Sequence, residues 1–261
     1  MWEYDPMGDV HGTQVVRRVG AILRAVGSTG LEGITASDLA AEVGLSRSTV
    51  HRLLTALAVE GFLDHEGARW RTGPELYLLG AASSPRYNVR GVALPTVLEL
   101  AELSGESAFF SARRGVESVC LIREDGSFPV RSFVLHEGVR FPLGVASAGL
   151  ALLAFESDGW IDDYLATADL ETRFGEPHSA SAIRERITAT RETGYAVNPG
   201  LIVEGSWGMG AAVFDAAGEP QWALSLNGIE SRFRPERQEE LGRMLVEHAH
   251  VLSRELINWH S

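Results

Sequence analysis

The chain has 261 residues, of which 45% are hydrophobic and 22% charged, and its formal net charge is −12 at pH 7. This length and hydrophobic fraction allow one large domain or two ordinary ones, each with a buried core. The single cysteine, Cys120, excludes an intrachain disulfide and a four-cysteine zinc site.

The charge is unevenly spread along the chain. Residues 1–80 hold 7 arginines against 10 acidic residues, and residues 81–261 hold 16 against 25. The first part is thus compatible with a local DNA contact, although the total charge limits non-specific affinity for DNA. No run approaches the about 18 apolar residues of a membrane span, and the first residues do not resemble a signal peptide. We therefore expect a cytoplasmic protein with no membrane partner.

Two helices are predicted near the start of the chain. Thr13 is expected to cap a helix that runs to about Val26. Its apolar face would consist of Val15, Val19, Ile22, Leu23 and Val26. Thr35 and Asp38 have the spacing of a capping box at the start of a second helix, which Gly44 would end in a left-handed conformation.

A third helix and a hairpin are predicted to follow. Ser46 would cap the helix, and Gly61 would end it. The buried stripe would consist of Val50, Leu53, Leu54 and Leu57. Residues 62–64 and 69–72 flank Gly67 and predict a small β-hairpin. Leu76 to Leu79 favour a further helical turn or two, and Ala81 to Pro95 is the best linker candidate.

From Pro95 the pattern becomes mixed. We expect helices at 97–103, 147–155, 161–165 and 182–192, and strands at 107–113, 118–124, 130–135, 208–214 and 222–227. A last helix would have Pro235 in its first turn and bury Leu241, Leu245, Leu252 and Leu256. Strands grouped with flanking helices predict an α+β domain with the character of a sensor.

Residues 39–46 have the pattern of a helix-turn-helix, with small Ala40 where two helices cross and Gly44 in the turn. The helix that follows carries hydroxyls and arginines near its N-terminus, and residues 46–58 contain no acid. Such a helix can donate to phosphates and base edges in the major groove. Arg69 and Arg71 flank Trp70 where a wing would touch the DNA backbone. A protein-interaction module with solvated arginines is the alternative interpretation.

Residues 34–54 read ITASDLAAEVGLSRSTVHRLL, and this segment resembles the winged helix of IclR-type bacterial transcriptional regulators. Gly61-Phe62-Leu63 and Arg71-Thr72-Gly73-Pro74 match the wing and the entry to the linker helix of that family. The predicted DNA-binding residues are Thr35, Ser46, Arg47, Ser48, Thr49, His51, Arg52, Arg69 and Arg71.

The resemblance continues through most of the chain, including 102–106, 140–143, 193–196, 211–215 and 223–226. It implies a GAF-like C-terminal domain that binds a small organic or aromatic acid between the sheet and the helix after Pro142-Leu143. The implied effector-binding residues are Ser147, Ala148, Asn198, Ser206, Gly208, Ser225 and Asn227. Backbone N–H groups at that helix start favour a carboxylate.

The chain departs from the family pattern at three positions. Leu150 stands where lysine is commoner, Gly144 where histidine is commoner, and Asn198 where an acid is often found. These changes remove polar or charged groups, so the ligand could be larger or less charged than a simple keto acid. For each effector residue, ordinary turn or strand packing is the alternative interpretation.

Catalytic interpretations fail on spacing. Ser147 lacks the first glycine of a nucleophile elbow. Cys120 lies in an apolar strand-like run that favours a buried, inert thiol. Residues 205–210 are glycine-rich but lack a Walker lysine. We therefore expect no enzyme activity, no cofactor and no metal.

The sequence thus predicts an α+β protein with three parts: a winged helix-turn-helix domain at 10–75, a linker helix region at 76–94 and a GAF-like effector-binding domain at 95–261. We expect a homo-oligomer, a dimer or a tetramer, that binds double-stranded operator DNA. The alternative function is a small-molecule sensor or enzyme whose helix-turn-helix serves protein contact. The effector, the operator and the sign of regulation stay open.

Overall fold

The computed structural model describes residues 13–87 and 89–260, so residues 10–12 of the predicted first domain lie outside it. The chain divides into two compact units, Met1–Asn88 and Val89–Ser261. Among the described residues, no helix is both long enough and apolar enough to cross a membrane.

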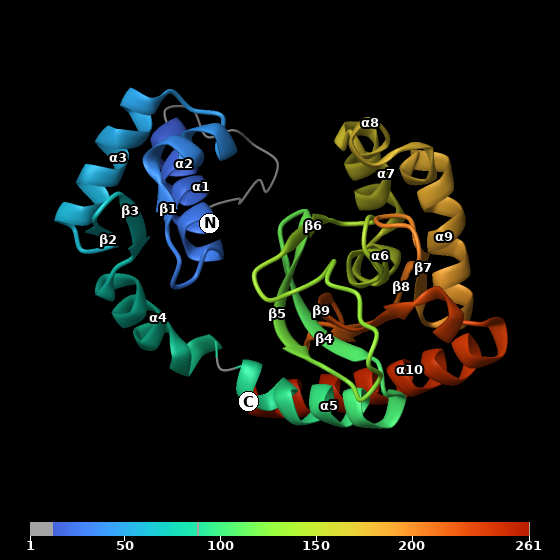
Figure 1. Cartoon of the computed structure of the whole chain (residues 1–261). Helices are drawn as coiled ribbons and strands as arrows, with labels where there is room; N and C mark the ends of the chain where they lie inside the picture. The colour runs from blue at the N-terminus through green and yellow to red at the C-terminus, as the bar shows by residue number, and fades with distance from the viewer. Residues whose placement is uncertain (1–12, 88, 261) are drawn as a thin grey trace. The chain divides into compact units, whose positions relative to one another are not determined.

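The first unit packs helices on a small sheet (Figure 1). Its elements are α1 (Gln14–Ser28), β1 (Ile34–Thr35), α2 (Ala36–Glu42), α3 (Arg47–Val59), β2 (Leu63–Glu66), β3 (Arg69–Thr72) and α4 (Pro74–Tyr87). The antiparallel sheet has the order β1-β3-β2. Its core contains Ile22, Val26, Leu39, Val50, Leu54, Leu57, Leu63 and Trp70. The sequence predicted the hairpin but missed β1.

The predicted caps of α2 and α3 are confirmed. Thr35 Oγ1 accepts from the backbone N–H of Asp38 at 3.2 Å, and Ser46 Oγ accepts from that of Thr49 at 3.3 Å. Gly44 ends α2 with a φ of +64°, a conformation that glycine adopts at little cost. Side-chain acceptors and a positive φ are local signals, which is why the sequence located this turn.

The prediction for α1 is partly wrong. Thr13 makes no side-chain capping hydrogen bond. Val15, placed on the buried face, is 53% exposed, whereas Ile22 and Val26 are fully buried. Only the second half of α1 packs on the core, so its first turn leaves apolar side chains uncovered.

Two helices occupy the region predicted as a linker. α4 continues through Tyr87, and α5 (Val89–Ser104) begins six residues before Pro95 and holds this proline in its interior. Proline at this position costs a helical hydrogen bond. The loss is offset because α5 buries Ala93, Val97 and other apolar side chains against the sheet.

The second unit is a six-stranded antiparallel sheet in the order β6-β5-β4-β9-β8-β7, with helices on both faces. Its strands are β4 (Ser107–Arg114), β5 (Glu117–Glu124), β6 (Arg140–Pro142), β7 (Ala196–Pro199), β8 (Ser206–Phe214) and β9 (Pro220–Ile229). Its other helices are α6 (Ser147–Ala154), α7 (Asp158–Thr167), α8 (Leu170–Phe174), α9 (Ala180–Thr193) and α10 (Pro235–His260), with short 3₁₀ turns at Glu176–His178 and Glu230–Arg232. The sequence missed β6, β7 and α8.

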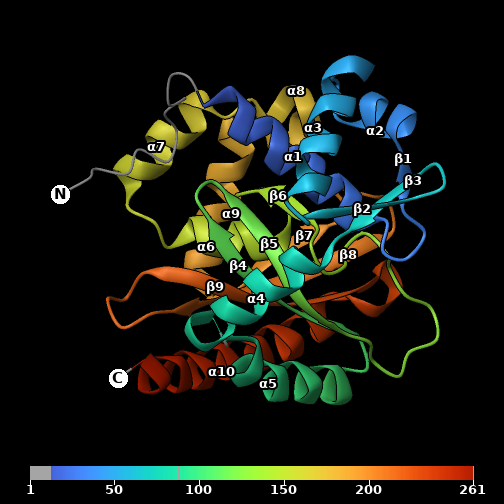
Figure 2. The same cartoon turned by 90° about the vertical axis from the view of Figure 1, so that its left-hand side faces the viewer.

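Two separate cores lie on the two faces of this sheet. α5 and α10 run side by side along one face, where the predicted leucines of α10 are buried (Figure 2). α6 lies on the other face and packs with α7 and α9 around a second apolar cluster. The first turn of α6 comes very close to β8: a Cβ added to Gly210 would lie 3.0 Å from the carbonyl of Ser147. Glycine at this position therefore lets α6 rest on the sheet.

The predicted strand at 130–135 is wrong, because the chain forms a loop from residue 125 to residue 139. Val130 and Phe133 are exposed, whereas Leu135 is buried. Arg131 stabilises the loop by donating to the carboxylate of Asp125 at 2.9 Å and to the Gly126 carbonyl at 3.2 Å. The apolar residues at 134 and 135 line a cavity and have no strand partner, which explains the misleading pattern.

His178 predicts a pH dependence of stability. It is 1% exposed and its Nδ1 lies 3.1 Å from the Phe174 carbonyl. Burial lowers the pKa of His178, and the nearby Arg186 charge lowers it further. As the pH falls through the ordinary pKa of about 6.5, the unfolded chain takes up the proton before the folded one does. Stability is therefore expected to decrease from pH 7.5 to pH 5.5.

The measurement is the melting temperature of wild type and of His178→Gln at several pH values in that interval. The variant should lose less stability than wild type as the pH falls, whatever its starting value, because it lacks this titration. Parallel curves would contradict the prediction.

Candidate DNA-binding surface and ligand cavity

The N-terminal half of α3 presents hydroxyls and cations to solvent. Ser46, Arg47, Ser48, His51 and Arg52 are all exposed. Ser46 Oγ lies 3.1 Å from Ser48 Oγ, and Arg47 Nη2 donates to Ser37 Oγ of α2 at 2.9 Å. The cap, the hydroxyls and a guanidinium are thus held at one helix end, where the helix dipole favours phosphate.

Two other predicted DNA-binding residues, Thr35 and Thr49, are less accessible to DNA. Thr49 is half-buried in the first turn of α3, and Thr35 is half-buried at the α2 cap, where its hydroxyl donates to the Asp38 carboxylate at 2.7 Å. The structure brings Ser46, Arg47, Ser48, His51 and Arg52 onto one exposed helix end; Thr35 serves the neighbouring helix.

The two wing arginines make contacts within the hairpin region. Arg69 Nη1 donates to the Gly33 carbonyl at 2.8 Å. Arg71 is half-buried and forms an ion pair with Glu66. The sequence did not indicate the acidic partner of Arg71, although the facing strands of a hairpin place such residues together. A phosphate at Arg71 would have to compete with Glu66.

This competition gives a prediction for the wing. Arg71→Ala should weaken binding to operator and to random DNA alike and lower the slope of log affinity against log salt by about one unit. Glu66→Gln should do the opposite, because it frees Arg71 for phosphate and removes a nearby negative charge. Fluorescence anisotropy titrations at several salt concentrations measure both effects.

Glu32→Gln is the matched control, since it changes the net charge equally from an exposed position outside the hairpin. An affinity gain in the control as large as that in Glu66→Gln would assign the effect to net charge. A loss in Arg71→Ala confined to operator DNA would make Arg71 a base-reading residue.

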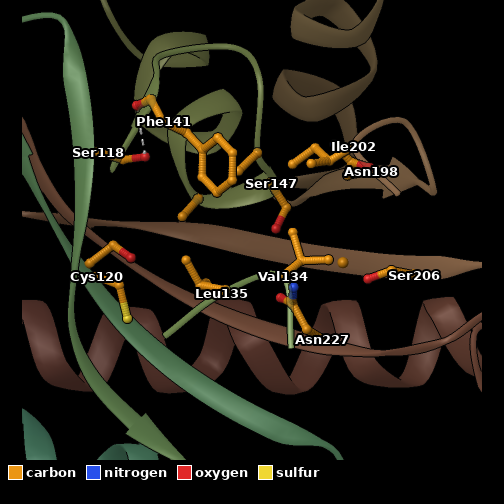
Figure 3. Close-up of a pocket in the computed structure, with 14 residues that line it drawn as sticks. Ser118, Cys120, Val134, Leu135, Phe141, Ser147, Asn198, Ile202, Ser206 and Asn227 are labelled. Atoms are coloured by element: carbon orange, nitrogen blue, oxygen red, sulfur yellow. Dashed lines mark hydrogen bonds between the residues drawn. The ribbon is translucent and has the colours of Figure 1, made fainter. Parts of the chain in front are cut away.

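A narrow, partly open cavity lies in the second unit, between the sheet and the first turn of α6 (Figure 3). The space between its lining residues is about 470 Å³ when open solvent is counted, and about 20 Å³ of it admits the centre of a water molecule. The cavity is lined by Ser111, Ser118, Cys120, Val134, Leu135, Phe141, Ala146, Ser147, Ala148, Asn198, Ile202, Ser206, Gly208 and Asn227. Six of the seven predicted effector-binding residues therefore line one cavity, on the side formed by α6, β7, β8 and β9.

Gly208 holds a polar corner of this cavity open. A Cβ added to it would lie 3.1 Å from Ser147 Oγ and 3.2 Å from Asn227 Oδ1. Asn227 Oδ1 is buried and has no hydrogen-bond partner among the described residues. A buried amide oxygen without a partner is costly, so this corner can take a hydrogen-bonding group of a ligand.

Asn198 and Ser206 are already engaged by the protein. Asn198 Nδ2 donates to the Val145 carbonyl at 2.8 Å, and its Oδ1 accepts from the Leu201 N–H at 3.0 Å. Ser206 Oγ lies 2.6 Å from Ser132 Oγ in the loop 125–139. Asn198 thus positions the chain just before α6, and Ser206 ties β8 to the loop that forms one wall.

Ser225 is the predicted residue that does not line the cavity. It is 0% exposed, and its hydroxyl has no partner among the described residues. It lies opposite Gly210 in the β8–β9 ladder, at the point where the first turn of α6 covers the sheet. Its position under α6 explains why it is closed off.

The opposite side of the cavity was missed by sequence reasoning. Its residues come from β4, β5 and β6 and from the loop 125–139. Ser118 and Cys120 are two residues apart on one strand and so share a face, which could have indicated a face directed toward a ligand. The resemblance to a family pointed only to the side formed by α6.

The lining of the cavity is uncharged. None of its lining residues carries a charged side chain. Cys120 is 2% exposed, and burial raises the pKa of its thiol to about 12, so the thiol is protonated at neutral pH. The prediction that the Cys120 thiol is buried is thus confirmed. Within the described part of the chain, no group of three or more His, Cys, Asp or Glu side chains could hold a metal ion.

Two family models match the chain. The IclR helix-turn-helix domain matches residues 15–67, and the bacterial transcriptional regulator IclR C-terminal domain matches residues 81–254. The chain belongs to the IclR family of bacterial transcriptional regulators. The resemblance inferred from residues 34–54 and the predicted α+β class are therefore confirmed.

Curated relatives of this IclR-family protein are regulators. The glycerol operon regulatory protein of Streptomyces griseus is 30% identical over 85% of this chain and 87% of its own length. The HTH-type transcriptional regulator BhcR of Paracoccus denitrificans is 28% identical, over 85% and 80%. The transcriptional repressor IclR of Escherichia coli is 26% identical, over 83% and 80%.

Solved structures share the fold. An IclR transcriptional regulator from Alicyclobacillus acidocaldarius has a TM-score of 0.76 at 22% identity, covering 92% of this chain and 97% of the other. An IclR homologue from Microbacterium hydrocarbonoxydans, complexed with 4-hydroxybenzoate, has a TM-score of 0.74 at 23% identity, covering 92% and 98%.

Proposed function

We propose that this IclR-family protein regulates transcription by binding operator DNA through the exposed end of α3 and the β2–β3 wing. The proposed DNA contacts are Ser46, Arg47, Ser48, Thr49, His51, Arg52, Arg69 and Arg71, with Thr35 supporting α2. The observation that carries this proposal is the capped, acid-free end of α3 with exposed arginines. Residues 10–75 would read DNA, 76–94 would connect and 95–261 would sense the effector.

The effector proposal concerns the cavity beneath α6. A small organic or aromatic acid would place its carboxylate at the first turn of α6, where backbone N–H groups lack helical partners. The remainder would lie against apolar residues such as Phe141 and Leu135. The relative that binds 4-hydroxybenzoate supports an aromatic acid. The protein would act by binding alone, with no catalytic step.

We propose that the protein works as a homo-oligomer. α4 leaves Tyr77, Leu78 and Leu79 exposed by 77%, 57% and 51%, an apolar surface that a second copy would cover. Two DNA-binding domains in one oligomer would match the two half-sites of a pseudo-palindromic operator. Leu78→Glu with Leu79→Glu should then shift the molar mass measured by light scattering toward that of a single chain, whereas an unchanged mass would place the interface elsewhere.

The experiment that tests the function is a thermal-shift screen of organic and aromatic acids, followed by operator binding with and without any acid that stabilises the protein. An effector must change the affinity for operator DNA, since only differential binding shifts an equilibrium between two states. A stabilising acid with no influence on DNA binding would contradict regulation through this cavity. Because operator DNA is cytoplasmic in bacteria, the proposal also places the protein there.

A further inference from the structure

The cavity has a second polar end that the proposed function leaves without a role. We name it the β4–β5 end and define it by Ser111, Ser118 and Cys120. Figure 3 shows Ser118 and Cys120 on the side away from Asn198, Ser206 and Asn227, with Phe141 and Leu135 between the two groups. The cavity is therefore polar at both ends and apolar in the middle.

An irregularity in the sheet directs Ser118 and Cys120 of β5 to the same face as Ser111. Phe110 pairs with Ile122, but the next residue of β4, Ser111, pairs with Cys120, so Leu121 is left over. Such a bulge changes the direction of the side chains that follow it. Phe110 and Ile122 belong to the core beneath α5 and α10, whereas Cys120 packs with Leu135 on the cavity side.

The polar groups at this end are buried and poorly satisfied. Ser111 is 2% exposed and lines the cavity. Ser118 Oγ lies 3.4 Å from the Phe141 carbonyl, which is a long hydrogen bond. A buried hydroxyl without a partner is unfavourable unless a ligand or water completes it.

The chemistry of this end selects an uncharged group. No charged side chain lines the cavity, and the backbone groups of β4 and β5 are used by the sheet. An ionised group buried here would lose its hydration with no cation or free N–H to replace it. Serine hydroxyls both donate and accept, so a hydroxyl or another neutral hydrogen-bonding group fits.

The register of the sheet gives the span of the cavity. Ser111 lies opposite Ala223 on β9, and Asn227 is four residues further along that strand. Four residues of a strand extend about 13 Å. Two hydrogen bonds of about 2.8 Å account for less than half of that span, and the remaining length matches a six-membered ring with a polar atom at each end. The side chains of the narrow cavity must move apart to admit such a ring.

We propose that Ser111, with Ser118 and Cys120 beside it, forms a second recognition subsite for an uncharged hydrogen-bonding group at the far end of the effector. The effector is then a rod-shaped monoanion: its carboxylate meets the first turn of α6, its ring lies against Phe141 and Leu135, and its neutral polar group meets Ser111. This inference rests on the proposed effector cavity and adds the class of ligand.

The test compares three para-substituted benzoates by isothermal titration calorimetry on the full-length protein. 4-Hydroxybenzoate should bind about 2- to 12-fold more tightly than 4-methylbenzoate, which has the same shape but cannot form the hydrogen bond. Terephthalate, with a second charge, should bind more weakly than both. In Ser111→Ala the preference for hydroxyl over methyl should disappear while the affinity for 4-methylbenzoate stays the same.

Ser147→Ala is the matched control, because it removes a hydroxyl from the opposite end and should weaken all three ligands without changing the hydroxyl preference. Equal affinity of wild type for the hydroxyl and methyl compounds, or a preference that survives in Ser111→Ala, would overturn the subsite while leaving the effector cavity in place. If none of the three binds, the aromatic effector and the subsite both fail. Operator binding by the same preparation shows separately whether the regulator function stands.

Discussion

Arg47→Ala and Arg52→Ala will each weaken operator binding by about 1–3 kcal/mol, or roughly 5- to 150-fold, where the arginine contacts a base. Both side chains are exposed on the end of α3 that carries no acid, and Arg47 is oriented by its 2.9 Å hydrogen bond to Ser37. Neither contributes to the buried core of the first unit. Folding and oligomeric state should therefore be unchanged.

The measurement is a mobility-shift or anisotropy titration with operator DNA. Arg184→Ala is the control, since it removes the same charge from α9 in the second unit, where Arg184 pairs with Asp162 at 2.5 Å. Unchanged operator affinity in both α3 variants would exclude this helix from the groove. A loss that is equal on random DNA would limit the two arginines to phosphate contacts.

Ala148→Trp will fold, bind operator and fail to respond to the effector. Ala148 lies in the first turn of α6 and lines the cavity, so a bulky side chain there occupies the space of the ligand. A ligand at about 100 times its Kd stabilises a protein by about 2.7 kcal/mol, and the variant should lose this gain. Thermal shifts with and without ligand measure the loss.

Ala189→Trp, on the exposed side of α9, is the control for adding a tryptophan and should keep the full ligand response. A full response in well-folded Ala148→Trp would place the effector elsewhere. A large loss of stability in the absence of ligand, beyond the about 1–3 kcal/mol of ordinary overpacking, would show that the site belongs to closed core.

The sequence predicted the first unit well because its signals are local. A capping hydroxyl contacts an N–H three residues away, and Gly44 needs a positive φ whatever surrounds it. The hairpin was predicted, but β1 was missed because its two residues become a strand only by pairing with Trp70 and Arg69 of β3. The ion pair of Arg71 with Glu66 also depends on that folded hairpin.

In the second unit, the errors occur where tertiary packing outweighs local preference. A helix was predicted only at 97–103, yet α5 begins at Val89 because its apolar side chains are buried on the sheet. The residues at 130–135 suggested a strand, but two of them, Val134 and Leu135, line a cavity. The pattern of apolar residues does not distinguish a strand partner from a ligand.

One side of the candidate effector site, the side formed by α6, could be predicted from the sequence, and the other side could not. The resemblance to a family led to the residues around α6, and the structure brings all of them except Ser225 to the cavity surface. The β4–β5 end depends on the bulge between Phe110 and Ser111, which arises from the pairing of two strands. A change of register of this kind leaves no mark in a single sequence.

The most direct test of sequence-specific DNA binding is selection of bound DNA from a random-sequence library. The full-length wild type and the Arg52→Ala variant are compared in the same selection. If an oligomer binds a pseudo-palindromic operator, wild type will enrich a sequence with two inverted half-sites that lie about one helical turn, or a multiple of it, apart. Arg52→Ala should enrich the same sequence less or accept other bases within each half-site. Failure of wild type to enrich any sequence, under salt conditions in which the protein is folded and oligomeric, would contradict sequence-specific regulation by this chain.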